Sequence, residues 1–325
     1  MRDTILFGDC KETLCAFLPE SARTCVTSPP YYGLRNYGDE ENQIGQEESP
    51  EEYVQNLVEV FREVRKILTD DGTLWLNMGD SYYNYRPGKG QGLVKQTVSN
   101  TKQDLPDKCA RRGNKLDGLK EKDLIGIPWM VAFALRADGW YLRQDIIWHK
   151  PNPMPESVKD RCTKSHEYIF LLTKNKKYYY DHEAIKEKAV GERWGGNKPI
   201  NMNNTKDTNN QFSGLTRPRK MVYDKRNKRS VWKVTNRPYR GTHFAVFPPE
   251  LITDCIKAGS QEGDIVLDPF MGSGTTAMVA KSLGRNYIGC ELHEDYGNLI
   301  QERVQDFHPV GEVSQEPSVN IFDIV

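Results

Sequence analysis

The chain has 325 residues, and its 45 lysine and arginine residues balance its 45 aspartate and glutamate residues, so its net charge neither favours nor excludes nucleic acid. Its length allows one large domain or two small ones, and its seven cysteines form no C-x-x-C pair, which argues against a disulfide framework and a structural zinc site. No apolar run approaches the roughly 20 residues that a membrane span needs, and the N-terminus lacks a signal-peptide pattern. We therefore expect a cytoplasmic protein without a metal or a membrane span.

The first predicted elements are a short strand, a helix and a second strand. Thr4–Gly8 is apolar and extended, and Lys11–Leu18 has a helical pattern. Asp9 lies between them and suits the N-cap of the helix. Arg23–Thr27 is the second strand, and it ends in Ser28-Pro29-Pro30-Tyr31. Consecutive prolines fix φ and hold the preceding residues extended, so this segment is expected to be a stiff strand exit.

A typical α/β unit follows the stiff segment. Arg35 lies in a polar and aromatic loop, where it either contacts a phosphate or is an ordinary surface residue. Residues 39–52 are acidic and form an improbable DNA face. A helix with an apolar stripe is predicted from Pro50 to Leu68,. Asp70-Asp71-Gly72 then turns the chain into a buried strand at Thr73–Asn77,.

The middle of the chain alternates a polar insertion with regular elements. Residues 84–123 are rich in Gly, Lys, Asn and Gln and cannot pack a core of their own,. Leu124–Asp138 is predicted to be a helix and Trp140–Trp148 a strand. Ser165–Thr173 is a further strand, and Tyr178–Asp181 could extend the sheet.

Residues 184–236 form a second insertion, whose later part interleaves basic and aromatic residues. Such a mixture suits a phosphate backbone with a few stacking or base-edge contacts. The alternative is a solvated basic loop. Arg226, Arg229 and Trp232 are the candidate DNA contacts.

Val266–Thr276 reads VLDPFMGSGTT and predicts a strand, a tight loop and the start of a helix,. Gly272 and Gly274 allow positive φ and a close approach of the backbone to a ligand, and the helix start offers free N–H groups. Asp268 at the strand tip suits a ligand that carries an ammonium group. A phosphate loop is excluded because no Gly-Lys-Ser/Thr follows.

The C-terminal part supplies one more carboxylate. A helix is predicted from Glu250 to about Ala258, before the glycine loop. Glu291 ends the strand Asn286–Glu291, soon after the helix of the glycine loop. A carboxylate in that position can accept hydrogen bonds from both hydroxyls of a ribose. A final helix at Asp295–Val304 precedes a loosely held tail at residues 310–325,.

The Ser-Pro-Pro-Tyr segment and the DPF-x-GSG loop together resemble the β class of DNA amino-methyltransferases, in which the catalytic segment precedes the S-adenosylmethionine (SAM) loop. The resemblance covers most of the chain apart from the two insertions and the tail. It implies an α/β fold: one catalytic domain over residues 1–325, built on a circularly permuted Rossmann-like SAM-dependent methyltransferase sheet with inserted target-recognition loops. Asp9, Ser28, Asp268 and Glu291 should then meet at the carboxyl ends of parallel strands.

The resemblance also implies roles for particular residues. The family has an acidic residue near the adenine of SAM, a His-x-Ala/Pro-x-Phe-Pro segment against SAM, and an aromatic-x-Lys-x-Asn-x-x-Pro pattern, matched at its end by Pro155, that lines the pocket of the flipped base. The implied cofactor residues are Asp9, His243, Phe244, Asp268, Pro269, Phe270, Gly272, Ser273, Gly274, Thr275 and Glu291. The implied target or DNA residues are Trp148, Lys150, Asn152, Arg35, Arg226, Arg229 and Trp232. Judged by residue type alone, Trp148 is more typical of a core.

The catalytic segment implied is Ser28, Pro29, Pro30 and Tyr31. The Ser28 hydroxyl and the Pro29 carbonyl would accept hydrogen bonds from the exocyclic amine of the target base. Tyr31 would stack on that base once it has left the duplex. No strong general base is needed, because the amine becomes acidic only after methylation.

Serine at the first position of the segment is the family's usual mark of N4-cytosine specificity, and N6-adenine is the nearest alternative. An RNA or protein methyltransferase and a non-catalytic DNA-binding protein on the same scaffold also stay open. Double-stranded DNA is the expected partner. A cognate restriction enzyme, a monomer or a homodimer, and a bacterial, archaeal or phage source all agree with the resemblance.

Overall fold

A computed structural model describes residues 2–33, 43–83, 118–189, 225–236 and 247–306. The predicted residues Arg35, His243 and Phe244 and the tail at 310–325 lie outside these ranges, as do most of both insertions. No helix in the described part of the chain is long and apolar enough to cross a membrane.

The described residues form an eight-stranded sheet in the order β1-β10-β9-β2-β3-β5-β4-β8. All neighbours pair in parallel except β5, which is antiparallel to both β3 and β4. A separate antiparallel pair is formed by β6 and β7. The strands are β1 (Thr4–Phe7), β2 (Ala22–Thr27), β3 (Leu68–Met78), β4 (Tyr141–His149), β5 (His166–Thr173), β6 (Glu187–Lys188), β7 (Lys225–Arg226), β8 (Val231–Lys233), β9 (Ile265–Asp268) and β10 (Asn286–Glu291).

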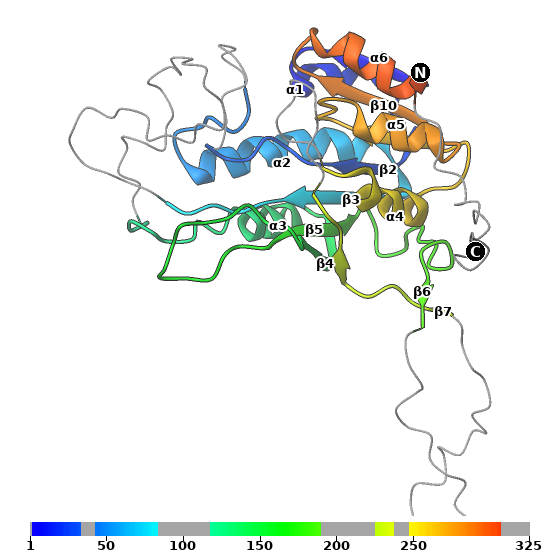
Figure 1. The fold of residues 1–325 in the computed structure, drawn as a ribbon. Coiled ribbons are helices and arrows are strands. Elements are labelled where there is room, and N and C mark those ends of the chain that lie inside the picture. Colours follow the sequence, from blue (N-terminus) through cyan, green and yellow to red (C-terminus); the bar gives the residue numbers. More distant parts are fainter. Residues whose placement is uncertain (1, 34–42, 84–117, 190–224, 237–246, 307–325) are drawn as a thin grey trace, which may run out of the picture.

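Helices cover both faces of this sheet (Figure 1). One hydrophobic core lies under α1, α2 and α3, and a second lies under α4, α5 and α6. The helices are α1 (Cys10–Thr13), continued by a short 3₁₀ helix at Leu14–Ala16, α2 (Pro50–Ile67), α3 (Ile127–Ala137), α4 (Pro249–Gly259), α5 (Thr275–Ser282) and α6 (Tyr296–Asp306). The expected α/β sheet is therefore confirmed, with the chain order permuted around it.

The helix boundaries follow from local sequence. The hydroxyl of Ser49 accepts a hydrogen bond from the backbone of Glu52 at 3.1 Å, and Pro50 occupies the first turn of α2. Acidic residues in the first turn and basic residues in the last turn interact favourably with the helix dipole,. α3 begins after Gly126 at φ 85°, a conformation that glycine adopts without a Cβ clash.

Three details differ from the sequence-based expectation. β3 already starts at Leu68, which pairs with Ala22, but regular pairing resumes only at Thr73 opposite Thr24, so residues 69–72 form an irregularity inside the strand instead of a turn before it. Tyr178–Asp181 forms no strand. Its backbone makes one hydrogen bond to Asp71 and one to Ala258, which is not the repeated pairing with one neighbouring strand that a sheet requires. No strand was predicted in the second insertion, whereas the structure has β8 there, paired with β4 at the sheet edge.

Candidate active site

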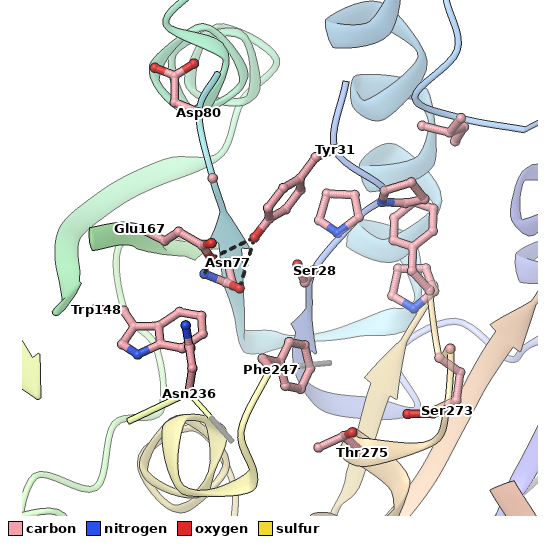
Figure 2. Close-up of a pocket in the computed structure, with 18 of the residues that line it drawn as sticks. Ser28, Tyr31, Asn77, Asp80, Trp148, Glu167, Asn236, Phe247, Ser273 and Thr275 are labelled. Atoms are coloured by element: carbon pink, nitrogen blue, oxygen red, sulfur yellow. Dashed lines mark hydrogen bonds between the residues drawn. The ribbon is translucent and has the colours of Figure 1, made fainter. Parts of the chain in front are cut away.

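A cavity of about 980 Å³ opens at the carboxyl ends of the parallel strands. Asp9, Ser28 and Glu291, which are far apart in sequence, all line it. The predicted meeting of these strand tips is thus found in the structure. Figure 2 shows the glycine-loop residues Ser273 and Thr275 across the cavity from the side chains that approach Tyr31.

Asp268, predicted to face the ligand, does not line the cavity and is 1% exposed. Its carboxylate accepts hydrogen bonds from the hydroxyls of Thr27 and Thr276, both at 2.6 Å, and from the backbone N–H of Phe270 at 3.0 Å. Burial raises the pKa of Asp268 from the usual 3.8 to about 6. The expectation of a direct ammonium ligand is corrected here: both carboxylate oxygens join the glycine loop to β2 and α5.

The glycine loop is shaped by positive backbone angles and by a second carboxylate. Gly272 has φ 54° and Gly274 φ 80°, and a Cβ on Gly274 would lie 2.9 Å from Ile300. Glu291 accepts hydrogen bonds from the backbone of Gly272 at 2.6 Å and of His293 at 3.1 Å. Burial raises the pKa of Glu291.

The loop leaves one polar atom unsatisfied. The hydroxyl oxygen of Thr275, the first residue of α5, is buried and has no hydrogen-bond partner among the described residues. Thr275 lines the cavity, as do Glu291, Phe247 and Phe270. A buried hydroxyl without a partner, a carboxylate and apolar rings around one cavity fit a ligand that has both polar and apolar parts, as SAM does.

The other predicted cofactor residues divide into those that line the cavity and those that do not. Pro269, Phe270, Gly272 and Ser273 line it, whereas Gly274 does not. Asp9 lines it and also caps α1, because its carboxylate accepts a hydrogen bond from the backbone of Lys11 at 2.9 Å. Phe247, which belongs to the segment predicted to lie against SAM, also lines the cavity, and sequence reasoning missed other lining residues, among them Met271, His293 and Tyr296.

The catalytic segment leaves β2 and lies along the cavity wall with all four of its residues, Ser28 to Tyr31. The Pro30 carbonyl accepts a hydrogen bond from the hydroxyl of Tyr53 on α2 at 2.8 Å. The Tyr31 hydroxyl donates to a carboxylate oxygen of Glu167 at 2.8 Å and lies 3.4 Å from the amide oxygen of Asn77 (Figure 2). Burial and the charge of Glu167 raise the pKa of Tyr31 well above its usual value.

The wall opposite the glycine loop contains Trp148, Lys150, Asn152 and Pro155, as the resemblance implied. Trp148 is also a core residue, 3% exposed, and its indole N–H donates to the Val234 carbonyl at 2.9 Å. Lys150 lies 4.2 Å from the centre of the Trp148 ring. The side chain of Asn152 exchanges two hydrogen bonds with the backbone of Asn236, at 2.9 and 3.0 Å.

Besides His293 and Tyr296, eight polar residues that line the cavity were not predicted, and three of them are Gln43, Glu156 and His166. Glu167 and Asn77 lie on strands whose apolar runs gave no sign that a polar side chain faces a cavity. The remaining three are Asp80, Lys164 and Asn236. Asp80 accepts hydrogen bonds from the backbone of Gly126 and Ile127 at the start of α3. Burial lowers the pKa of Lys164.

Trp232 was predicted to contact DNA, and the structure corrects this. It is 5% exposed, its ring centre lies 6.5 Å from that of Trp75, and its indole N–H donates to the Arg229 carbonyl at 2.8 Å. A ring enclosed in this way offers no free face to a base. Arg226 and Arg229 both donate to one oxygen of Glu187 at 2.8 Å, and neither lines the cavity.

Known structures share this architecture. PvuII DNA methyltransferase (cytosine-N4-specific) superposes with a TM-score of 0.60 at 18% identity, over 93% of this chain and 86% of that one. A Thermus thermophilus protein solved in complex with S-adenosyl-L-methionine gives a TM-score of 0.55 at 23% identity, over 94% and 95% of the two chains. At these identities the likeness shows the fold alone, an α/β architecture that this chain shares with both proteins.

Sequence comparisons give the family. The profile of the family described as DNA methylase, N6/N4 type, matches residues 22–302. The Type II methyltransferase M.SmaI of Serratia marcescens is 46% identical over 92% of this chain and 90% of its own length. The Type II methyltransferase M.Cfr9I of Citrobacter freundii is 45% identical over 93% and 87%. The chain belongs to this family of SAM-dependent DNA amino-methyltransferases.

Proposed function

We propose that the protein transfers a methyl group from SAM to the exocyclic N4 of a cytosine that has been flipped out of duplex DNA. The observation that carries the proposal is the position of Ser28. It stands at the carboxyl end of β2 and lines the same cavity as Gly272, Ser273 and Thr275 of the glycine loop. An acceptor for the amine and a loop suited to the methyl donor therefore face one space.

The residues of the catalytic segment would act on the amine by hydrogen bonding. The lone pair of an exocyclic amine is delocalised into the base ring, so the amine is a poor nucleophile. The Ser28 hydroxyl and the Pro29 carbonyl would accept its two protons and draw the nitrogen towards tetrahedral geometry. The Pro30 carbonyl is already bonded to Tyr53, which agrees with assigning the acceptor role to Pro29.

Tyr31 would hold the flipped base by stacking. Extrusion of a base costs a few kcal/mol, and stacking on an aromatic ring returns about 1–3 kcal/mol. Because burial and Glu167 raise the pKa of Tyr31, its phenol stays protonated and its hydroxyl donates to Glu167.

On the cofactor side, Glu291 would accept hydrogen bonds from a ribose, and the apolar rings of Phe247 and Phe270 would enclose the adenosine part. The unpartnered Thr275 hydroxyl would find a polar group of the cofactor. Bound SAM supplies an activated methyl group on a sulfonium. Asp268 would act indirectly, by keeping the glycine loop in place through Thr27, Thr276 and Phe270.

The choice of cytosine rests on the serine at position 28, the family's usual mark of N4-cytosine enzymes. The fold shared with the cytosine-N4-specific PvuII enzyme agrees with it. Double-stranded DNA is the proposed substrate. The Type II names of the relatives suggest a modification enzyme with a cognate restriction partner in the bacterial cytoplasm. Arg226 and Arg229 are proposed to contact the DNA backbone, and a monomeric or dimeric state stays a prediction.

The test is to incubate plasmid and genomic DNA with the protein and isotope-labelled SAM, and to identify the methylated nucleoside by mass spectrometry. Label on N4-methylcytosine supports the proposal, and the Ser28→Ala variant should then give almost none. Label on N6-methyladenine would support the same mechanism with adenine, instead of cytosine, as the target base. Bound SAM without any methylated DNA nucleoside would point to an RNA or protein acceptor instead.

A further inference from the structure

We propose that Glu167 is the positioning residue of the target-base pocket, which holds Tyr31 of the catalytic segment and Lys150 of the opposite wall in fixed places. The inference rests on the proposed methyl transfer to a flipped base, and it applies equally to cytosine and adenine. None of the sequence motifs includes Glu167, which lies within the predicted strand at 165–173.

The contacts of Glu167 join two walls of the cavity. One carboxylate oxygen accepts the Tyr31 hydroxyl at 2.8 Å, and the Asn77 amide nitrogen lies 3.3 Å from it. The other oxygen forms an ion pair with the ammonium group of Lys150. Both side chains of this pair are only 16% exposed. A shielded pair of this kind keeps its geometry better than a surface pair, because each charge depends on the other for compensation.

The sheet register explains why this carboxylate reaches both walls. β5 is the antiparallel strand between β3 and β4, and Glu167 pairs directly with Trp148. Directly paired residues of an antiparallel ladder lie on the same face of the sheet. Lys150, two residues beyond Trp148, extends over that tryptophan ring to the same carboxylate.

A glycine makes room for the contact. A Cβ on Gly79, just beyond the end of β3, would lie 2.7 Å from a ring carbon of Tyr31 and 3.3 Å from the carboxyl carbon of Glu167. Any larger residue would therefore push the phenol and the carboxylate apart. The tight three-residue packing indicates a fixed position for the Tyr31 ring.

The consequence concerns the orientation of Tyr31. The prolines fix its backbone, and Glu167 fixes the far end of its side chain, so the ring cannot swing out of the position where the base would stack. Lys150, whose charge is already compensated, is assigned to hold Glu167 rather than to bind a phosphate. Glu167 touches neither the reacting amine nor the methyl group in this role.

The experiment is a double-mutant cycle on the full-length protein with Glu167→Ala, Tyr31→Phe and the combined variant. Measured quantities are kcat, KM for duplex DNA, the dissociation constant of SAM, and the fluorescence of 2-aminopurine placed next to the target base. We expect each single variant to lower kcat/KM for DNA about 10-fold, as expected for the loss of one charge-assisted hydrogen bond. We expect the combined variant to be no more than about twofold worse than the worse single variant, since both remove the same bond.

A purely structural role would not give this pattern. Affinity for SAM should stay within about twofold of the wild type, whereas the 2-aminopurine signal should change, because only the base pocket is altered. Glu167→Gln retains the shape and one acceptor oxygen, so it should fold normally and lose about threefold. Asp138→Asn is the matched control: its carboxylate is also 16% exposed in an ion pair, with Arg62, and it does not line the cavity. It should leave kcat/KM unchanged.

The outcomes separate this inference from the proposed function. If the wild type is active and both Glu167→Gln and Glu167→Ala have a kcat/KM for DNA within twofold of it, the role of Glu167 is overturned, and the proposed function stands. Equal losses in SAM affinity and DNA turnover, or additive effects in the cycle, would also overturn it. A wild type that binds SAM and methylates no DNA would instead overturn the proposed function.

Discussion

The two loops that face the cavity are held in different ways. The glycine loop is bound to Asp268 and Glu291 by hydroxyl and backbone N–H donors, nearly all of them from residues 268–293. The catalytic segment is held instead by groups far away in sequence: the hydroxyl of Tyr31 meets Asn77 and Glu167, which are 46 and 136 residues further along. The proposed cofactor side is thus assembled locally, and the proposed base side is assembled from separate strands.

This difference predicts that the two sides can be damaged independently. Changes around Asp268 should affect SAM binding and stability, and changes around Tyr31 should affect the use of DNA. Thr27 is the link between them, because it ends the strand that leads to Ser28 and donates to Asp268 across 241 residues.

The largest effect is expected for Ser28→Ala. The variant loses the hydroxyl that accepts a hydrogen bond from the exocyclic amine, and this hydrogen bond becomes stronger as the amine reacts. We expect kcat to fall by about 100- to 1,000-fold, comparable with the loss of one preorganised hydrogen bond in other active sites. Affinity for SAM, measured by calorimetry, should change less than about twofold. Ser282→Ala, whose hydroxyl bonds only within its own helix, is the control. Full methylation by the Ser28 variant would remove the catalytic assignment.

A pH-dependent effect follows from the raised pKa of Asp268. Its pKa is 3.8 when unfolded and about 6 when folded, so the folded state holds the proton more tightly. Asp268 therefore adds stability as the pH falls from 6 towards 4, by up to about 3 kcal/mol, and Asp268→Asn lacks this contribution. Denaturant unfolding at several pH values should show the difference in free energy of unfolding, wild type minus variant, increasing towards acid. A difference independent of pH would contradict the burial of this carboxylate.

Asp268→Ala should weaken SAM binding even though the carboxylate does not face the cavity. It leaves the hydroxyls of Thr27 and Thr276 and the N–H of Phe270 without their acceptor, and the loop loses its anchor. We expect SAM to bind about 30-fold more weakly, with kcat at saturating SAM nearly retained. Asp264→Ala, at the opposite end of β9, should bind SAM normally. Wild-type affinity of the Asp268 variant for SAM would show that the glycine loop keeps its conformation without this carboxylate.

Gly79→Ala tests the base side by steric means. The new Cβ would be 2.7 Å from the Tyr31 ring, closer than carbon atoms approach without a shift. Because the ring must move, we expect kcat/KM for DNA to fall about 10-fold while SAM affinity serves as the unchanged internal control. Unaltered use of DNA would mean that the position of the ring does not matter.

The smallest functional effect is expected for Trp232→Phe. The variant loses the indole hydrogen bond to Arg229 and part of the packing against Trp75, so unfolding should need about 1–2 kcal/mol less. DNA affinity, measured at two salt concentrations, should stay at the wild-type value. Weaker DNA binding by a variant that is as fully folded as the wild type would instead support the DNA contact predicted from the sequence.

Most residues on the glycine-loop side of the cavity could be predicted from sequence because the signals there are short-range. Gly272, Thr275 and Glu291 follow from one strand–loop–helix–strand segment of residues 266–291. The same signals do not fix side-chain direction, which is why Asp268 was expected in the cavity and lies below it. Spacing places a carboxylate at a strand tip, but only the neighbouring Thr27, from a distant strand, decides where that carboxylate points.

The base side is predictable only in part, for the same reason. Ser28 is found from its own motif, whereas Glu167 and Asn77 contribute to the site through pairings of β3, β5 and the catalytic segment that no local pattern encodes. The mixture of basic and aromatic residues near Trp232 does not indicate in which direction the side chains point. Its burial follows from β8 joining the sheet, a long-range pairing.

The pairing of β8 with β4 has a consequence for any exchange of the second insertion between relatives. Residues 225–236 belong to the second insertion by sequence, yet Val234 accepts the indole N–H of Trp148 and Asn236 is bonded to Asn152 on the pocket rim. A chimera that replaced the whole insertion would therefore also replace part of the catalytic wall. The useful joints for such a graft lie before residue 225, so that the host keeps its own β8 and receives only the foreign segment upstream of it.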